Sequence, residues 1–213
     1  MEALGRFGEN ATAAIPKLMT LARQPDQMWG AISALSLMGT NAVPGLMDLY
    51  RDGTPGQHSM AAKTFIKRGA NAAAAVPILV EDLTDESANR VALAALVLGG
   101  IGEKGRVAIP GLVELTHDEN AEVRLRAAAA LWRLDRKTNT VLPVLILELE
   151  TWSKKPNALR SRSTDQHGKS RQEIVAEILG KIGLAARKAV PLLQMMMRGS
   201  FDERKKPPRK LFA

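Results

Sequence analysis

The fold is decided by residues 98–112, whose sequence is LGGIGEKGRVAIPGL. Gly102 stands eight residues before Pro110, and both features recur along the chain. The recurring prolines, 28, 33, 33, 33 and 48 residues apart, are Pro16, Pro44, Pro77, Pro110, Pro143 and Pro191. The markers before them, at a distance of eight residues in five cases and five residues in one, are Gly8, Gly39, Gly69, Gly102, Asp135 and Gly183. Two features that keep a common spacing indicate an internal repeat of about 33 residues.

Each marker has a physical reason in a pair of helices. Proline suits the first turn of a helix, where its missing N–H has no partner. Apolar residues at helical spacing follow each proline, as in Leu112 and Leu115, and predict a short first helix, the A helix. An alanine-rich second helix, the B helix, is predicted after a polar turn and ends at the marker glycine, which tolerates a left-handed backbone; Asp135 should make a poorer cap. A hairpin of this length cannot bury its own apolar stripe, so neighbouring hairpins must stack into one core.

The repeat resembles HEAT repeats, especially the short bacterial variety related to phycobilin-lyase-type repeats. The resemblance rests on residues 98–112 and on Leu179-Gly180-Lys181-Ile182-Gly183 through Ala189-Val190-Pro191. It implies an all-α fold, a right-handed α–α superhelix, but it says almost nothing about chemistry, because these repeats are used for many functions. We expect the chain itself to be a binding scaffold and not an enzyme. We expect one solenoid over residues 1–200, with half-units at 1–8 and 184–200 and five hairpins at about 9–39, 40–69, 70–102, 103–135 and 136–183. Because a capping repeat would normally cover the open first half-unit, we expect the chain to be a fragment of a larger bacterial protein.

The composition excludes several alternatives. With 46% apolar but only 4% aromatic residues, the chain favours closely packed helices over a β-sandwich or barrel. The absence of cysteine excludes disulfides, zinc–thiolate sites and cysteine nucleophiles. No apolar run reaches the roughly 18 residues that span a bilayer. Residues 1–10 lack the apolar core of a signal peptide, which favours a cytoplasmic location, although a fragment would hide a lost signal.

Positive charge is concentrated in the last third of the sequence. The net charge is +8, but residues 1–150 hold 15 Lys and Arg against 17 Asp and Glu, whereas residues 151–213 hold 15 against 5. The last hairpin carries a basic insertion at 153–168, and a basic tail at 201–213 is expected to be flexible. The cations of the insertion are Lys154, Lys155, Arg160 and Arg162. Such insertions often lie on the binding face of a solenoid, but a solvated loop and a solubilising tail would explain the same residues.

The B helices are expected to line the inner face of the solenoid. Two residues before the markers, this face would present Arg6, Leu37, Lys67, Gly100, Arg133 and Lys181. The cations among them either form a ladder that contacts a ligand or simply stabilise helix C-termini through the helix dipole. Leu93 and Leu96, together with Val97, predict an apolar patch on the same face. An error in the assumed helical register is the alternative explanation of that patch.

The three tryptophans are expected to play different parts. Trp132 occupies a position that holds small residues in most other repeats, so we expect it to protrude beside Arg133 and Arg136 as an anchor or stacking platform. Trp29 is expected to fill the core. Trp152 is expected to pin the insertion to the stack.

The sequence contains no pattern that points to catalysis or to a cofactor. The three histidines lack metal-ligand spacing, which argues against a likeness to the iron-dependent hydroxylases built from HEAT-like repeats. The leading hypothesis is therefore a scaffold whose inner face holds a helix or an extended segment of another protein. The alternative is nucleic-acid binding through the basic C-terminal region, in the manner of the HEAT-like alkylpurine DNA glycosylases. That alternative needs tryptophans and an acidic residue to converge, with Trp132 and Asp135 as candidates, and the acidic balance of residues 1–150 opposes it.

Overall fold

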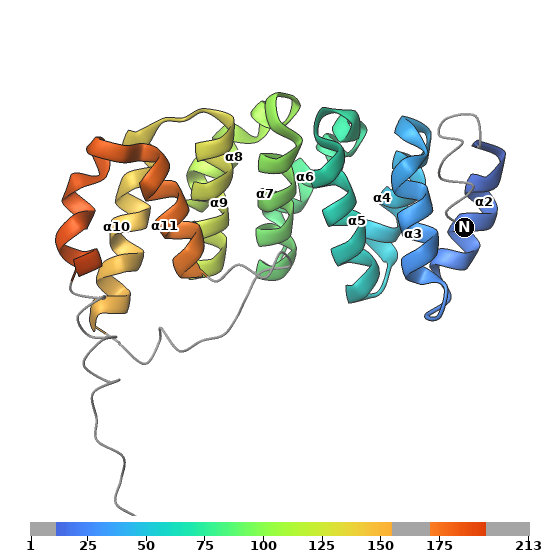
Figure 1. Cartoon of the computed structure of the whole chain (residues 1–213), viewed down its shortest axis with the longest axis horizontal. Helices are drawn as coiled ribbons and strands as arrows, with labels where there is room; N and C mark the ends of the chain where they lie inside the picture. Colours follow the sequence, from blue (N-terminus) through green and yellow to red (C-terminus); the bar gives the residue numbers. More distant parts are fainter. Residues whose placement is uncertain (1–11, 155–170, 195–213) are drawn as a thin grey trace, which may run out of the picture. The chain divides into compact units, whose positions relative to one another are not determined.

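The computed structural model describes residues 12–154 and 171–194, and every regular element within these ranges is a helix (Figure 1). The predicted all-α class is thus confirmed. The chain divides into two compact units, and the boundary falls between Arg136 and Lys137. The half-unit at 1–8, the tail at 201–213 and most of the insertion lie outside the described residues.

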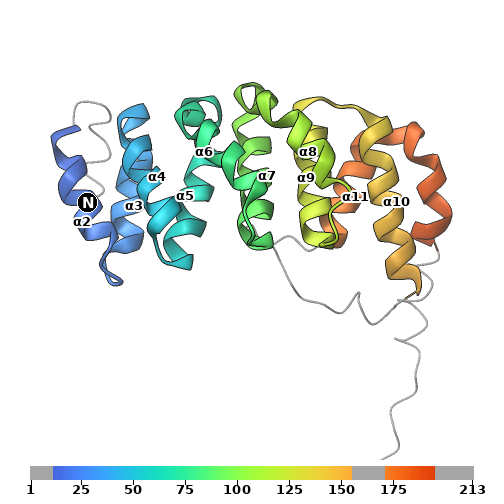
Figure 2. The ribbon, with the colours of Figure 1, turned by 180° about the vertical axis from the view of Figure 1, so that it is seen from behind.

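The first unit alternates A and B helices. The A helices are α2 (Ile15–Ala22), α4 (Val43–Asp52), α6 (Val76–Glu81) and α8 (Ile109–Leu115). The B helices are α3 (Met28–Leu37), α5 (Pro55–Arg68), α7 (Ala88–Ile101) and α9 (Ala121–Leu134). Short 3-10 helices join them at η2 (Gly39–Ala42), η3 (Gly69–Ala75), η4 (Asp82–Thr84) and η5 (Gly102–Ala108). Each B helix packs against its own A helix, and consecutive B helices pack in the pairs α3–α5, α5–α7 and α7–α9, so that these four helices form one layer and the A helices lie on its other side (Figures 1 and 2).

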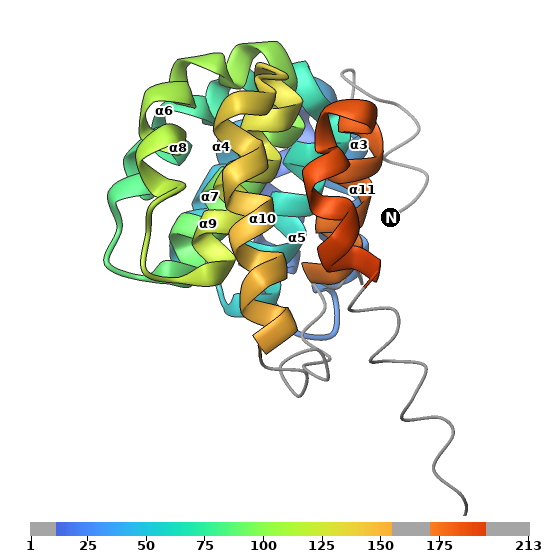
Figure 3. The ribbon, with the colours of Figure 1, turned by 90° about the vertical axis from the view of Figure 1, so that its left-hand side faces the viewer.

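The second unit contains α10 (Thr138–Lys154), α11 (Arg171–Ile182) and η7 (Gly183–Ala189), and a further helical segment begins at residue 190. The helix α10 packs against both α11 and η7 (Figure 3). Trp152 is buried on α10, with 4% of its surface exposed. Whether it pins the insertion stays a prediction, because residues 155–170 lie outside the described ranges.

Four of the recurring prolines lie in the first turn of an A helix, as their spacing predicts: Pro16, Pro44, Pro77 and Pro110. For Pro143 the prediction is wrong, because it lies inside α10. No glycine precedes it, and the helix already begins at Thr138. Pro143 therefore removes one hydrogen bond from the helix interior, where the N–H of any other residue would donate to the carbonyl of Asn139.

The marker glycines have the positive φ angles that the repeat predicts. The angles are 67° at Gly39, 54° at Gly69, 79° at Gly102 and 65° at Gly183. The ψ angles of Gly69 and Gly102 are −128° and −139°, which is the mirror image of extended backbone and not the left-handed helical region that we expected. Only glycine enters that region at little cost.

Asp135 departs from the glycine pattern, as expected, and the backbone shows how. Its own φ is −129°, and the positive φ of 56° falls one residue later, at Arg136. A side chain in this conformation costs roughly 1–2 kcal/mol relative to glycine. Among residues 12–136, the end of α9 is thus the one hairpin boundary with a positive φ at a residue other than glycine.

Small residues let successive B helices approach closely in the first unit. A Cβ atom added to Gly100 would lie 2.8 Å from Ile66 Cγ1 on α5. A Cβ atom added to Gly99 would lie 2.8 Å from the Cα atom of Ala130 on α9. Each glycine therefore forms a notch, here meaning a position without a side chain against which the neighbouring helix packs. Gly100 makes room for α5 and Gly99 for α9, so that α7 is closely packed on both sides.

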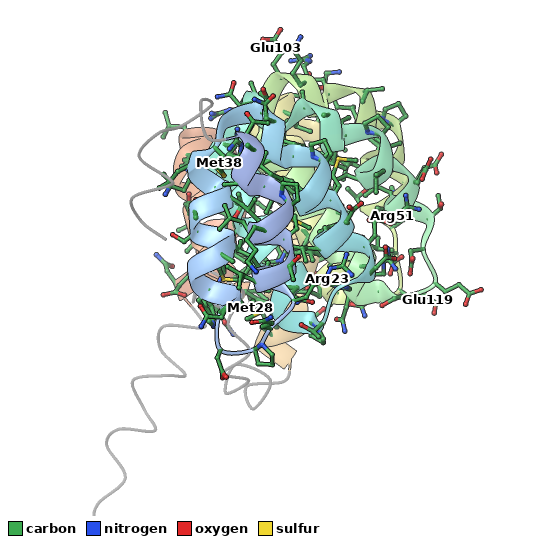
Figure 4. All side chains as sticks on the ribbon, turned by 90° about the vertical axis from the view of Figure 1, so that its right-hand side faces the viewer. Arg23, Met28, Met38, Arg51, Glu103 and Glu119 are labelled. Atoms are coloured by element: carbon green, nitrogen blue, oxygen red, sulfur yellow. The ribbon has the colours of Figure 1, made fainter. Side chains whose placement is uncertain are left out.

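The two ends of α3 are marked by methionines that face the core to different extents (Figure 4). Met38, at the C-terminal end, is buried with 1% of its surface exposed, and Met28, at the N-terminal end, is half-buried. Glu103, in η5, and Glu119, in the turn between α8 and α9, are exposed and point outward (Figure 4). The turns therefore present charge to solvent, whereas the helix interiors present alanine and leucine to one another.

Candidate binding surface

Side chains at repeat-equivalent positions of α5, α7 and α9 lie on one face of the B-helix layer, here called the B-helix face. Positions three and four residues apart share one side of a helix, and the three helices pack in sequence. The face consists of Met60, Lys63, Lys67, Leu93, Leu96, Gly100, Arg126, Ala129 and Arg133. It is the part of the described chain where the residues predicted from the sequence come together most fully.

Cations stand on both sides of the middle helix of this face. Lys67 on α5 and Arg133 on α9 are exposed, and Gly100 lies at the equivalent position of α7 between them. Arg126 is buried and donates to Glu122 Oε1 from Nε at 2.7 Å. Neither Lys67 nor Arg133 forms an ion pair with a described residue, so each is available to an external anion.

The helix-dipole explanation of these cations also remains open. Lys67 lies in the last turn of α5 and Arg133 in the last turn of α9. Lys181 lies in the last turn of α11, in the second unit, and pairs with Glu177. A cation at a helix C-terminus is stabilised by about 0.3–1 kcal/mol when exposed, and this effect does not prevent it from contacting a ligand.

The apolar patch expected at Leu93 and Leu96 is only partly present. Leu93 is half-buried, but Leu96 is 5% exposed and Val97 is completely buried. The expectation of an exposed patch is therefore wrong for Leu96 and Val97. The physical reason is the close packing of α7 between α5 and α9, which covers both flanks of the helix.

Trp132 does not protrude, contrary to expectation. Only 7% of its surface is exposed, and the guanidinium carbon of Arg136 lies 5.3 Å from the centroid of the indole ring. A cation at this distance attracts the face of the indole ring. The predicted association of Trp132 with Arg136 is confirmed, but it is an internal contact at the end of α9 and leaves little indole for a ligand.

Trp29 is also placed differently from the prediction. It is 61% exposed on α3, so the expectation that it fills the core is wrong. Leu37 is 47% exposed on the same helix, eight residues later. Residues eight apart lie on one side of a helix, so α3 presents an apolar side that the sequence analysis missed.

A buried polar cluster in the A-helix layer was not predicted either. Tyr50 on α4 is 3% exposed, and Asp82 in η4 is 7% exposed. Burial, and then the nearby negative charge of Asp82, raise the pKa of the Tyr50 hydroxyl above its ordinary value. Arg90 on α7 pairs with Asp82 at 3.3 Å and with Asp85 at 3.3 Å. The cluster joins two consecutive hairpins. The sequence feature that could have pointed to it is Tyr50, the single tyrosine of the chain.

The basic insertion contributes little to what the structure describes. Lys154 is the last residue of α10, and its side chain is not described. Lys155, Arg160 and Arg162 lie outside the described residues. Their part in binding therefore stays a prediction.

The described residues form neither a metal site nor a membrane-spanning helix. Within residues 12–154 and 171–194, no group of three His, Asp or Glu side chains is arranged to hold a metal ion. None of the helices described combines the length and the apolar character that crossing a membrane requires.

No protein-family model matches the sequence, and no curated protein matches it significantly.

Proposed function

We propose that the protein is a non-enzymatic scaffold whose hairpins follow one another in a right-handed superhelix of the HEAT-like kind and whose B-helix face binds another protein. The repeat spacing, the positive-φ glycines and the two helix layers of the first unit support the architecture. The observation that carries the binding proposal is the exposure of Lys67 and Arg133 on either side of the half-buried Leu93.

The chemistry of this face defines the kind of partner that fits it. The two cations, one on α5 and one on α9, suit two acidic side chains of a partner that are separated by the width of the intervening helix α7. Leu93, on α7, offers an apolar contact between them. A segment of another protein with an apolar residue flanked by Asp or Glu would satisfy both. Because the cations are exposed, they contribute more to the rate of association and to specificity than to the affinity itself.

Photo-crosslinking identifies such a partner directly. A benzophenone amino acid in place of Leu93 should crosslink to one defined partner in cell extract. The same residue in place of Val113, which is exposed on the A-helix α8, is the matched control and should give no such adduct. Mass spectrometry then identifies the crosslinked peptide, which should be acidic.

Charge reversal tests whether the cations matter. The double variant Lys67→Glu/Arg133→Glu should reduce the yield of the Leu93 adduct by about tenfold or more at low salt. The double variant Lys17→Glu/Lys104→Glu changes the net charge equally, at exposed positions on α2 and η5, and should leave the yield unchanged. Equal loss in both double variants would mean that net charge, and not this face, drives binding.

Nucleic-acid binding is the second candidate, favoured by the excess of 15 Lys and Arg over 5 Asp and Glu in residues 151–213. A site of the glycosylase kind finds no support at its two expected residues. Trp132 is buried, and Asp135 Oδ1 accepts from Arg106 Nη2 at 3.2 Å. A labelled DNA duplex, titrated at roughly 50 and 200 mM salt, should lose affinity by orders of magnitude if phosphate contacts dominate. If the duplex does not bind at the lower salt, this candidate is excluded.

A further inference from the structure

The second unit has an apolar groove, here called the C-terminal groove, between α11, η7 and the helical segment that begins at residue 190. Its volume is about 520 Å³. Its walls include Ala176, Leu179, Gly180, Leu184, Val190 and Leu193. Leu184 is 92% exposed and Val190 is 45% exposed.

The repeat shows what such a groove accepts. Gly183 and Gly102 are equivalent markers 81 residues apart. With this offset Leu179 corresponds to Leu98, Gly180 to Gly99, and Leu193 to Leu112. In the first unit the corresponding elements α7, η5 and α8 all pack against α9. The C-terminal groove is therefore equivalent to the surface against which a B helix packs. Such a surface is here called the seat of that helix.

The helix α9 fills the first seat, whereas none of the described residues fills the second. Leu98 and Leu112 are completely buried, and a Cβ atom on Gly99 would lie 2.8 Å from the Cα atom of Ala130. Gly180 is exposed, and a Cβ atom there would meet nothing within 4 Å. The second unit thus keeps the glycine notch that admits a helix backbone, but no described residue enters it.

The residues that follow in the sequence do not repeat α9. With the same offset of 81 residues, the sequence of residues 202–213 aligns with the first twelve residues of α9, and Pro207 and Pro208 align with Arg126 and Ala127. Proline inside a helix costs about 3 kcal/mol or more. Arg204 stands where α9 has the buried Val123. This stretch therefore lacks the sequence of a B helix that could fill the groove as α9 fills its own seat.

We propose that the C-terminal groove binds one alanine-rich amphipathic helix of another protein, in the way that α7, η5 and α8 hold α9. The bound helix has a small residue opposite Gly180 and leucine or valine toward Leu179 and Leu193. Its C-terminal carbonyls lie near Arg187, because the equivalent Arg106 donates from Nη1 to the carbonyl of Leu134 at 2.9 Å. This site is separate from the B-helix face and does not depend on its function.

The test uses the full chain and a fluorescent peptide with the sequence of residues 119–136, which contains α9. We expect saturable binding by fluorescence anisotropy. A peptide with Ala130→Leu should bind about tenfold more weakly or worse, because its larger side chain cannot approach Gly180. Absence of saturable binding by the first peptide, or equal binding of the two peptides, overturns the proposal.

Variants of the full chain locate the site. Gly180→Ala and Gly180→Leu should each weaken peptide binding, and both should fold, since nothing lies within 4 Å of a Cβ atom at this position. Leu184→Ala should also weaken binding. Leu147→Ala is the matched control, an exposed leucine on α10 that does not line the groove, and should leave binding unchanged. Unchanged affinity in the Gly180 variants contradicts the proposal.

Two further measurements exclude other occupants. If the wild type is a dimer by light scattering and Gly180→Leu makes it a monomer, a second copy fills the groove. If the double variant Leu211→Ser/Phe212→Ser raises peptide affinity about tenfold or more, the tail of the same chain fills it. Either result overturns the assignment to another protein; a monomer with unchanged affinity supports it.

Discussion

The interface between α7 and α9 and the C-terminal groove are built from residues at equivalent repeat positions, yet α9 fills the first and no residue of the described ranges fills the second. Leu98 and Leu179 are both buried, but Gly99 meets the backbone of the following helix, whereas Gly180 is exposed and a Cβ atom there would meet nothing within 4 Å. The comparison teaches that a repeat motif determines the shape of the surface on which a helix can pack, but does not determine whether a helix packs there. It also makes the two sites matched pairs, in which the same substitution has different consequences.

The largest difference is expected for truncation of two leucines at equivalent repeat positions. Leu112→Ala should lower the free energy of unfolding by roughly 2–5 kcal/mol, because Leu112 is completely buried and its truncation leaves a cavity in a closed interface. Leu193→Ala should cost clearly less, because Leu193 is only half-buried beside the C-terminal groove. Urea denaturation followed by circular dichroism measures both. Equal losses would mean that the groove is closed in solution.

The next effect is expected at the glycine notch of the first unit. Gly99→Ala should lower the free energy of unfolding by roughly 1–3 kcal/mol, because the new methyl group meets the backbone of Ala130. The nearest atom is a Cα, which cannot rotate away, so α9 must shift. Denaturation midpoints test this, and a stability equal to that of the wild type would place α9 farther from α7 than the structure does.

A smaller loss is expected for the arginine at the end of the filled seat. Arg106→Gln removes the hydrogen bond to the carbonyl of Leu134, with an expected cost of about 0.5–1.5 kcal/mol. The ion pair with Asp135 adds little, because the side chain of Arg106 is 51% exposed. Arg187→Gln, at the equivalent position of the open groove, should leave the stability unchanged. Thermal denaturation of the two variants decides the comparison, and equal losses would contradict it.

The smallest effect is expected to have the opposite sign. Gly180→Ala should raise the stability of α11 by about 0.5–1 kcal/mol, because alanine restricts the unfolded chain and meets no atom in the folded state. Slower hydrogen exchange of the α11 amides would confirm it. Faster exchange would indicate that the groove is already occupied.

The sequence predicts the regular hairpins well because their markers act locally. A proline determines where a first turn can begin, and a glycine determines where a positive φ is affordable, so Pro77, Pro110, Gly69 and Gly102 all occupy their expected places. Pro143 does not. Without a glycine to end the preceding segment, α10 begins five residues before the proline. The proline alone is therefore insufficient to determine where the helix begins.

The candidate site was predicted less well because burial depends on neighbours. Trp29 and Trp132 were assigned opposite environments from those observed. Each assignment compared a residue with its equivalents in other repeats, but Leu125, the equivalent of Trp29, is buried in a helix with neighbours that α3 lacks among the described residues. The cover that Arg136 gives to Trp132 follows from the strained turn at the end of α9, which no spacing rule predicts.

The notch at Gly100 has a consequence for how such a chain can evolve. Ile66 fits against Gly100, and the other hairpins have leucine, lysine or arginine at the position of Gly100. Excision of residues 70–102 would preserve the local backbone pattern at the junction, yet it would bring Ile66 against Arg133. The hairpins are therefore not interchangeable modules, and gene duplication or loss of one of them would require compensating changes in its new neighbours.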